Sequence, residues 1–61
     1  MKRSELERLL RDNGCYPLHK GTRHDKWYSP ISGLVVLLPR HQAKELAVGT
    51  VRTILKTAGV L

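Results

Sequence analysis

Apolar residues recur at helical spacing near both ends of the chain and at strand spacing between them. Near the N-terminus three leucines fall on one helical face: Leu6, Leu9 and Leu10. Ser4 and Glu7 have the spacing of a capping box, in which the two side chains satisfy the first free N–H groups of a helix. Asn13-Gly14 ends the pattern, since glycine readily adopts the left-handed conformation. A first helix from Ser4 to about Asn13 is therefore predicted.

Between residues 15 and 39 the period changes to that of strands. Turn residues separate three segments, namely Cys15–Lys20, Arg23–Ser29 and Leu34–Leu38. Pro17 cannot donate a ladder hydrogen bond, which favours an edge position for the first segment. The third segment is apolar at every position, as is typical of a strand in the middle of a core, and Pro39 stops it. The pattern predicts a three-stranded antiparallel sheet.

The middle segment presents two different faces. Alternation groups His24, Lys26 and Tyr28 on one side, and it groups Arg23, Asp25, Trp27 and Ser29 on the other. We expect Trp27 to pack beneath the helices and Cys15 to be a small core residue.

The C-terminal segment returns to helical spacing. Its apolar face consists of Val51, Ile54, Leu55 and Ala58. Thr50 is the expected N-cap and Gly59 the expected end. Residues 40–48 fit either a loop or one helical turn around residues 43–46. The resulting order predicts a single α+β domain over residues 1–61, a three-stranded antiparallel sheet with two helices packed on one face. The double-stranded-RNA-binding domain (dsRBD) has this α-β-β-β-α order.

The net charge of the chain favours some classes of binding partner over others. Eleven Lys and Arg residues against five Asp and Glu give the chain a formal charge of +6 and a pI near 10.1. On so small a protein this charge favours nucleic acid as the partner. An anionic membrane surface is less favoured, because neither helix carries aromatic anchors. The longest apolar run, Leu34–Leu38, is too short to cross a membrane. A lone cysteine and the lack of a signal-peptide pattern favour the cytoplasm.

The stretch from Lys20 to Trp27 concentrates the groups that RNA chemistry needs. Cleavage requires a proton carrier near neutral pH, and histidine is the side chain suited to that task. His24 is therefore the candidate general base or acid. The candidates for holding RNA are Lys20, Gly21, Thr22, Arg23, Lys26 and Tyr28. Lys26 is the better phosphate ligand because it shares the face of His24, and Tyr28 on that face is a candidate for base stacking.

The functional hypotheses for the other two histidines are weaker. His41 is a candidate second proton carrier, or equally a structural residue at the sheet edge, and His19 is most simply a solvated side chain. Three histidines and one cysteine match no recognised metal-site spacing, so the sequence predicts neither a metal nor a cofactor. Without further context, a lone strand histidine is more often an ordinary surface residue than a catalytic one.

Three motifs resemble those of one family over essentially the whole chain. They are Gly21-Thr22-Arg23-His24, Leu38-Pro39-Arg40-His41 and the closing segment Gly49–Gly59. The chain resembles HicA, the small toxin of bacterial HicA–HicB toxin–antitoxin pairs. The resemblance implies a dsRBD-like fold, a ribonuclease that cleaves mRNA without a metal, and a HicB antitoxin that blocks its active site. It also implies that His24 is the catalytic histidine.

The match departs from the family pattern at one position. Many members carry two adjacent histidines, and here the first is Arg23. This departure keeps the reactive histidine, His24, and leaves open how the phosphate is held. Two other readings stay open at this point: a non-catalytic RNA-binding module of the same fold, and a protein whose open sheet face or strand edge docks another chain.

Overall fold

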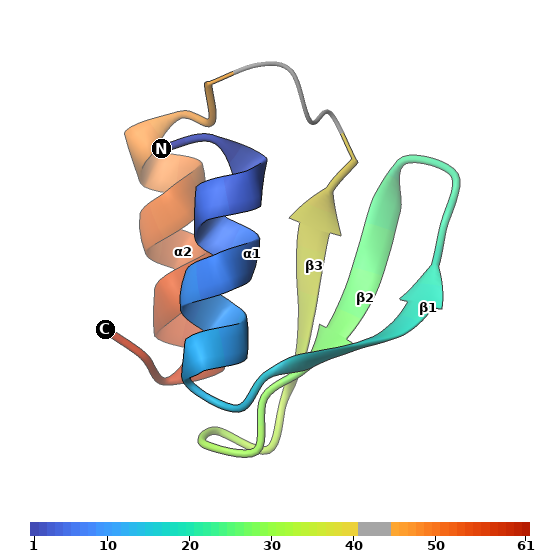
Figure 1. Ribbon diagram of the computed structural model, residues 1–61, viewed down its shortest axis with the longest axis vertical. Coiled ribbons are helices and arrows are strands. Elements are labelled where there is room, and N and C mark those ends of the chain that lie inside the picture. The colour runs from blue at the N-terminus through green and yellow to red at the C-terminus, as the bar shows by residue number, and fades with distance from the viewer. Residues whose placement is uncertain (41–44) are drawn as a thin grey trace.

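Two helices and three strands follow one another in the predicted order. The computed structural model describes residues 1–40 and 45–61. The elements are α1 (Arg3–Asp12), β1 (Tyr16–Lys20), β2 (His24–Tyr28), β3 (Val35–Pro39) and α2 (Val48–Ala58) (Figure 1). The predicted α+β class is confirmed. The hypothesis for His41, and the first half of the helical turn proposed around residues 43–46, lie outside the described residues; Glu45 and Leu46 are not helical.

The sheet is an antiparallel meander with β2 in the middle, in the order β1-β2-β3. The edge position predicted for the Pro17 strand is confirmed, and the pairing of β1 with β2 shifts register between Pro17 and His19. The expectation of a strand buried on both sides was wrong for β3. It is an edge strand that buries Val36 and Leu38, while Val35 and Leu37 are 48% and 53% exposed. Short turns pair each strand with the next, so the last strand cannot enter the centre of the sheet.

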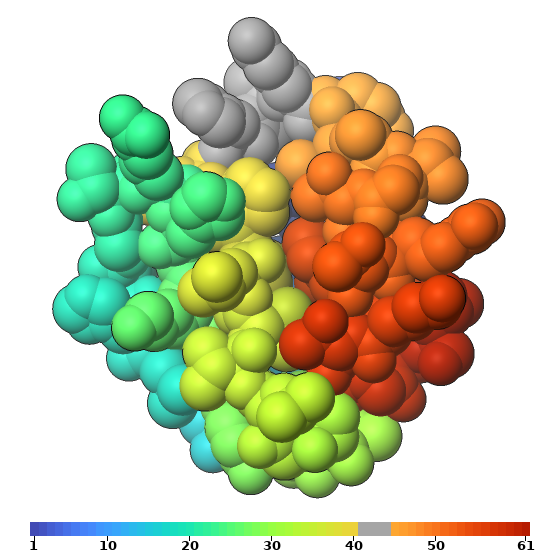
Figure 2. All heavy atoms as spheres, turned by 180° about the vertical axis from the view of Figure 1, so that it is seen from behind, coloured from blue at the N-terminus to red at the C-terminus, as the bar shows by residue number. Residues whose placement is uncertain are grey.

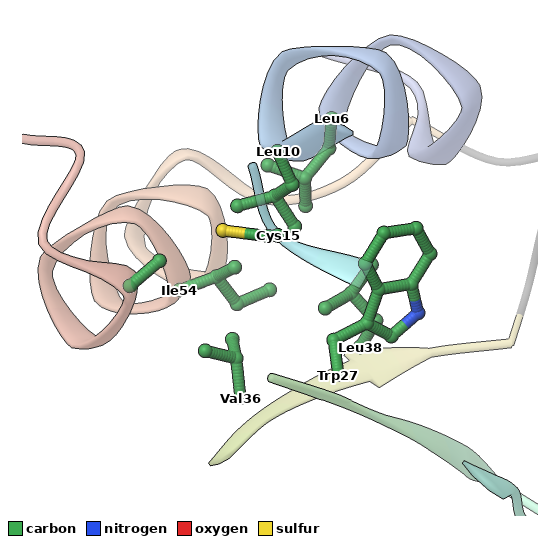
Figure 3. Packing of buried hydrophobic residues seen from close by; sticks show 8 residues of the cluster. Leu6, Leu10, Cys15, Trp27, Val36, Leu38 and Ile54 are labelled. Atoms are coloured by element: carbon green, nitrogen blue, oxygen red, sulfur yellow. The ribbon is translucent and has the colours of Figure 1, made fainter. Parts of the chain in front are cut away.

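Both helices pack on one face of the sheet (Figure 1). Figure 3 shows side chains of α1 and α2 meeting those of β2 and β3 between the two layers. The buried apolar residues are Leu6, Leu10, Cys15, Trp27, Val36, Leu38, Ile54 and Ala58. The core positions predicted for Cys15 and Trp27 are confirmed, with Trp27 only 2% exposed. The two helices cover one side of the three-stranded sheet. Among the described residues, no helix or loop covers the opposite side.

Both helices begin earlier than their expected caps. Ser4 lies inside α1, whose N-cap is Lys2. The Glu5 carboxylate accepts the Lys2 N–H at 3.1 Å, so half of a capping box is present, two residues before the predicted one. Thr50 lies inside α2, whose N-cap is Ala47 and makes no side-chain hydrogen bond. The predicted end at Gly59 is confirmed by its left-handed φ of 76°.

Candidate functional site

The middle strand sends alternate side chains to opposite sides of the sheet. Asp25 and Trp27 are buried, His24 and Lys26 are exposed, and Tyr28 is half-buried. We call the side without helices the open face; it carries His24, Lys26 and Tyr28 from β2 and Val35 and Leu37 from β3. Figure 2 shows the three strands side by side from behind, with α2 beside β3. The predicted grouping of His24 with Lys26 and Tyr28 is confirmed.

His24 lies at the rim of a hollow between the end of β3 and the start of α2. His24 pairs with Pro39 across the strands. The hollow has a volume of about 350 Å³ and is lined by His24, Leu37, Pro39, Gly49, Thr50, Thr53 and Ile54. The imidazole is therefore reachable from solvent and is flanked by apolar side chains and two hydroxyl groups.

The first turn of α2, which lines this hollow through Gly49 and Thr50, has N–H groups that the helix itself does not use. The first backbone bond of the helix runs from the Val51 N–H to the Ala47 carbonyl at 3.0 Å. The N–H groups of Val48, Gly49 and Thr50 precede it and have no acceptor within the helix. The first turn contains no acidic residue. The positive end of the helix dipole thus lies beside His24 with no acidic side chain in its first turn, an arrangement that favours an anion. Sequence reasoning missed this neighbour, since it lies about 25 residues away along the chain.

The turn between β1 and β2 requires glycine at its first position. A Cβ atom on Gly21 would lie 2.1 Å from the carbonyl oxygen of His24. Arg40 ties this turn to the end of β3: its Nη1 donates to the Gly21 carbonyl at 2.7 Å, and its backbone N–H donates to the Arg23 carbonyl at 3.2 Å. Gly21 therefore has a steric role in the turn that precedes His24.

The remaining predicted RNA ligands do not gather around His24. Lys20 pairs with Asp25 across the strands and lies on the helix side of the sheet. Thr22 and Arg23 are exposed in the turn. Arg23 precedes β2, so strand alternation does not assign it to the face opposite His24 as the sequence pattern suggested. The structure brings Lys26 and Tyr28 to the face of His24 and leaves the other predicted ligands at the turn or behind the sheet.

A buried ion pair lies directly behind the candidate site. The Asp25 carboxylate accepts a hydrogen bond from Arg3 Nη2 at 2.8 Å, and Arg40 Nε lies 3.3 Å from its other oxygen. Arg3 and Asp25 are both almost fully buried. The pair joins the start of α1 to β2, and Arg40 extends the connection to β3 and the turn.

Sequence reasoning missed this ion pair, although one signal was present. Alternation placed Asp25 on the same side as Trp27, and a carboxylate on a core face needs a cationic partner. Arg3 and Asp25 are 22 positions apart in the chain, so the identity of that partner depended on how α1 packs against the sheet.

Two other kinds of site receive no support from residues 1–40 and 45–61. No group of three His, Cys, Asp or Glu side chains there lies close enough to hold a metal ion. In the same part of the chain, no helix is both long and apolar enough to span a membrane.

Comparison with known proteins gives one family. The model of the HicA toxin of bacterial toxin–antitoxin systems matches residues 3–60, which is nearly the whole chain. No curated protein and no solved structure matches the chain.

Replacing Gly21 with Ala should destabilise the fold by about 1–3 kcal/mol, because the backbone must move to separate the new Cβ from the His24 carbonyl. Urea unfolding followed by Trp27 fluorescence measures the loss. Gly49→Ala is the matched control, since a Cβ there meets nothing within 4 Å and alanine favours a helix. A Gly21→Ala protein as stable as the control would contradict the steric role.

Arg3→Leu and Asp25→Leu should each cost about 3–5 kcal/mol of unfolding free energy, because each leaves a buried charge without its main partner. The double variant should cost clearly less than the sum, as a double-mutant cycle by urea unfolding would reveal. If a single variant is unfolded in water, a double variant that still folds would show the same coupling between the two side chains. Purely additive losses would show that the two side chains do not depend on each other.

Proposed function

The chain belongs to the HicA family of bacterial toxins, and on this premise we propose that it is an endoribonuclease that cleaves mRNA with His24 as general acid or base. RNA carries its own nucleophile, so the reaction needs no metal-bound water. The 2′-oxygen attacks the adjoining phosphorus, the bond to the 5′-oxygen breaks, and a 2′,3′-cyclic phosphate and a 5′-hydroxyl form. The protein must move protons between these oxygens and stabilise charge on the phosphate.

The observation that carries the proposal is the position of His24 beside the start of α2, whose N-cap residue, Ala47, makes no side-chain hydrogen bond. The hollow that His24 borders also contains Gly49 and Thr50 of the first helical turn. A phosphate group seated there would accept hydrogen bonds from free helix N–H groups while its ester oxygens face the imidazole. Histidine is the residue type best suited to general acid–base catalysis, and His24 is the one histidine among the residues lining the hollow.

Lys26 and the Thr50 hydroxyl group of α2 complete the proposed site. Lys26 is exposed two positions along β2 on the same face, where its ammonium group suits the next phosphate of the chain. Thr50 lines the hollow and offers its hydroxyl group to phosphate or ribose oxygens, whereas the Thr53 hydroxyl donates to the Gly49 carbonyl at 2.9 Å. The net charge of +6 attracts the polyanion toward this surface. We expect the protein to act in the cytoplasm, where mRNA is found.

Toxins of this family are one half of a toxin–antitoxin pair. We propose that the partner is a HicB-like antitoxin that covers the open face and thereby excludes RNA from His24. The exposed Val35 and Leu37 side chains offer it apolar contacts beside the cationic region.

His24→Ala should lower the rate of RNA cleavage by about 100-fold or more, because general acid–base catalysis contributes at least that much. Its fold and RNA affinity should stay close to those of the wild type, since the side chain is exposed. The assay compares the purified proteins on mRNA with a chelator present, and His19→Ala is the matched control. Full activity of His24→Ala would remove His24 from the mechanism. Uncleaved RNA in every sample, with binding intact, would instead identify a non-catalytic RNA-binding module.

An equimolar amount of the protein encoded beside this toxin should stop cleavage and slow chemical acylation of Lys26, because both depend on access to the open face. Acylation of Lys56, on the outer side of α2, serves as the internal reference. A complex that forms while Lys26 reacts at its free rate would show that the antitoxin binds elsewhere.

A further inference from the structure

Two tyrosines form an exposed aromatic pair on the open face. Tyr16 of β1 lies opposite Tyr28 of β2, and their ring centroids are 5.6 Å apart with the planes tilted by 49°. Tyr28 is half-buried, while Tyr16 is 47% exposed. Cross-strand aromatic pairs stabilise a sheet by packing on each other. That role accounts for the contact between the rings but leaves much of the Tyr16 ring in water, where it contributes nothing to the core.

The aromatic pair belongs to the same row of side chains as the candidate catalytic group. His24, Lys26 and Tyr28 follow one another along the open side of β2. At about 3.3 Å per residue, Tyr28 lies roughly 13 Å from His24 along the strand, with Lys26 midway. His19 of β1 pairs with Lys26 across the strands. The face therefore presents an imidazole, an ammonium group and an aromatic surface in sequence.

This order of groups suits single-stranded RNA. A cationic side chain can hold the backbone while an aromatic ring stacks on a base that is not paired. A duplex has its bases stacked inside the helix and offers only backbone and groove edges to a protein, so exposed tyrosines would have no partner there. The neighbouring Lys26 and the charge of +6 favour a polyanion over a protein as the occupant.

We propose that Tyr16 and Tyr28 form a stacking site for an unpaired base of the RNA whose scissile phosphate lies at His24. The inference rests on the proposed function, and it adds a binding residue, Tyr16, and a substrate requirement: RNA that is single-stranded over the few nucleotides next to the cleaved bond. Helix α1 then serves the core, while the RNA runs from the start of α2 over the side of the sheet that the helices leave open.

The test measures binding separately from cleavage. In the full chain carrying His24→Ala, Tyr16→Leu should weaken binding of a fluorescently labelled single-stranded oligonucleotide by about fivefold or more, the effect of losing one stacked base. Tyr16→Phe keeps the ring and should bind like the parent. Leu18→Ala, also on β1 and 53% exposed, controls for loss of exposed apolar surface. Binding of a duplex of the same sequence should be unchanged by all three substitutions.

In the protein that retains His24, Tyr16→Leu should raise KM for single-stranded RNA and leave kcat nearly unchanged, because the base contact is made equally before and in the transition state. Near-parental single-strand affinity in a folded Tyr16→Leu protein would overturn the inference, as would an equal loss for the duplex. Either result leaves cleavage by His24 untouched. Conversely, a stacking effect in a protein that cleaves no RNA would overturn the proposed function and keep Tyr16 as a binding residue.

Discussion

The rest of the structure depends on one contact, that of the Asp25 carboxylate with the Arg3 and Arg40 side chains. Asp25 and Arg3 are buried, and an unpaired charge there would cost several kcal/mol. The start of α1 must therefore lie over β2, where Arg3 reaches the carboxylate. Arg40 brings the end of β3 and the β1–β2 turn to the same point. One carboxylate thus connects a helix, two strands and a turn.

This interior contact also decides which side chains reach solvent. Strand side chains alternate, so a one-residue slip of β2 would turn Asp25 and Trp27 outward and bury His24 and Lys26. The slip would break the ion pair and empty the centre of the core at once. The exposed position of the imidazole is therefore a consequence of what lies behind it. A substitution at Arg3 or Asp25 is expected to act on His24 through the register of β2.

The small size of the protein explains why its working surface is a sheet face. Two helices cover one side of three strands, and among the described residues nothing covers the other. The open face divides into a polar and aromatic part over β1 and β2 and an apolar part on β3, with Val35 and Leu37 about half exposed. The proposed RNA site uses the first part and the start of α2. The apolar part is available to a protein partner, which suits a toxin whose activity an antitoxin must control.

Local patterns in the sequence determined the element order, the α+β class and the separation of His24, Lys26 and Tyr28 from Trp27. These follow from spacings within a few residues, where periodicity and turn chemistry are reliable. Tertiary structure decided what lies beside each face: that Arg3 pairs with Asp25, that α2 begins beside His24, that β3 is an edge strand and that Tyr16 meets Tyr28. It also decided where both helices begin. The observed N-caps, Lys2 and Ala47, are residue types that the usual N-cap preferences would not select. Each of these depends on packing between segments distant in the chain, which no local spacing specifies.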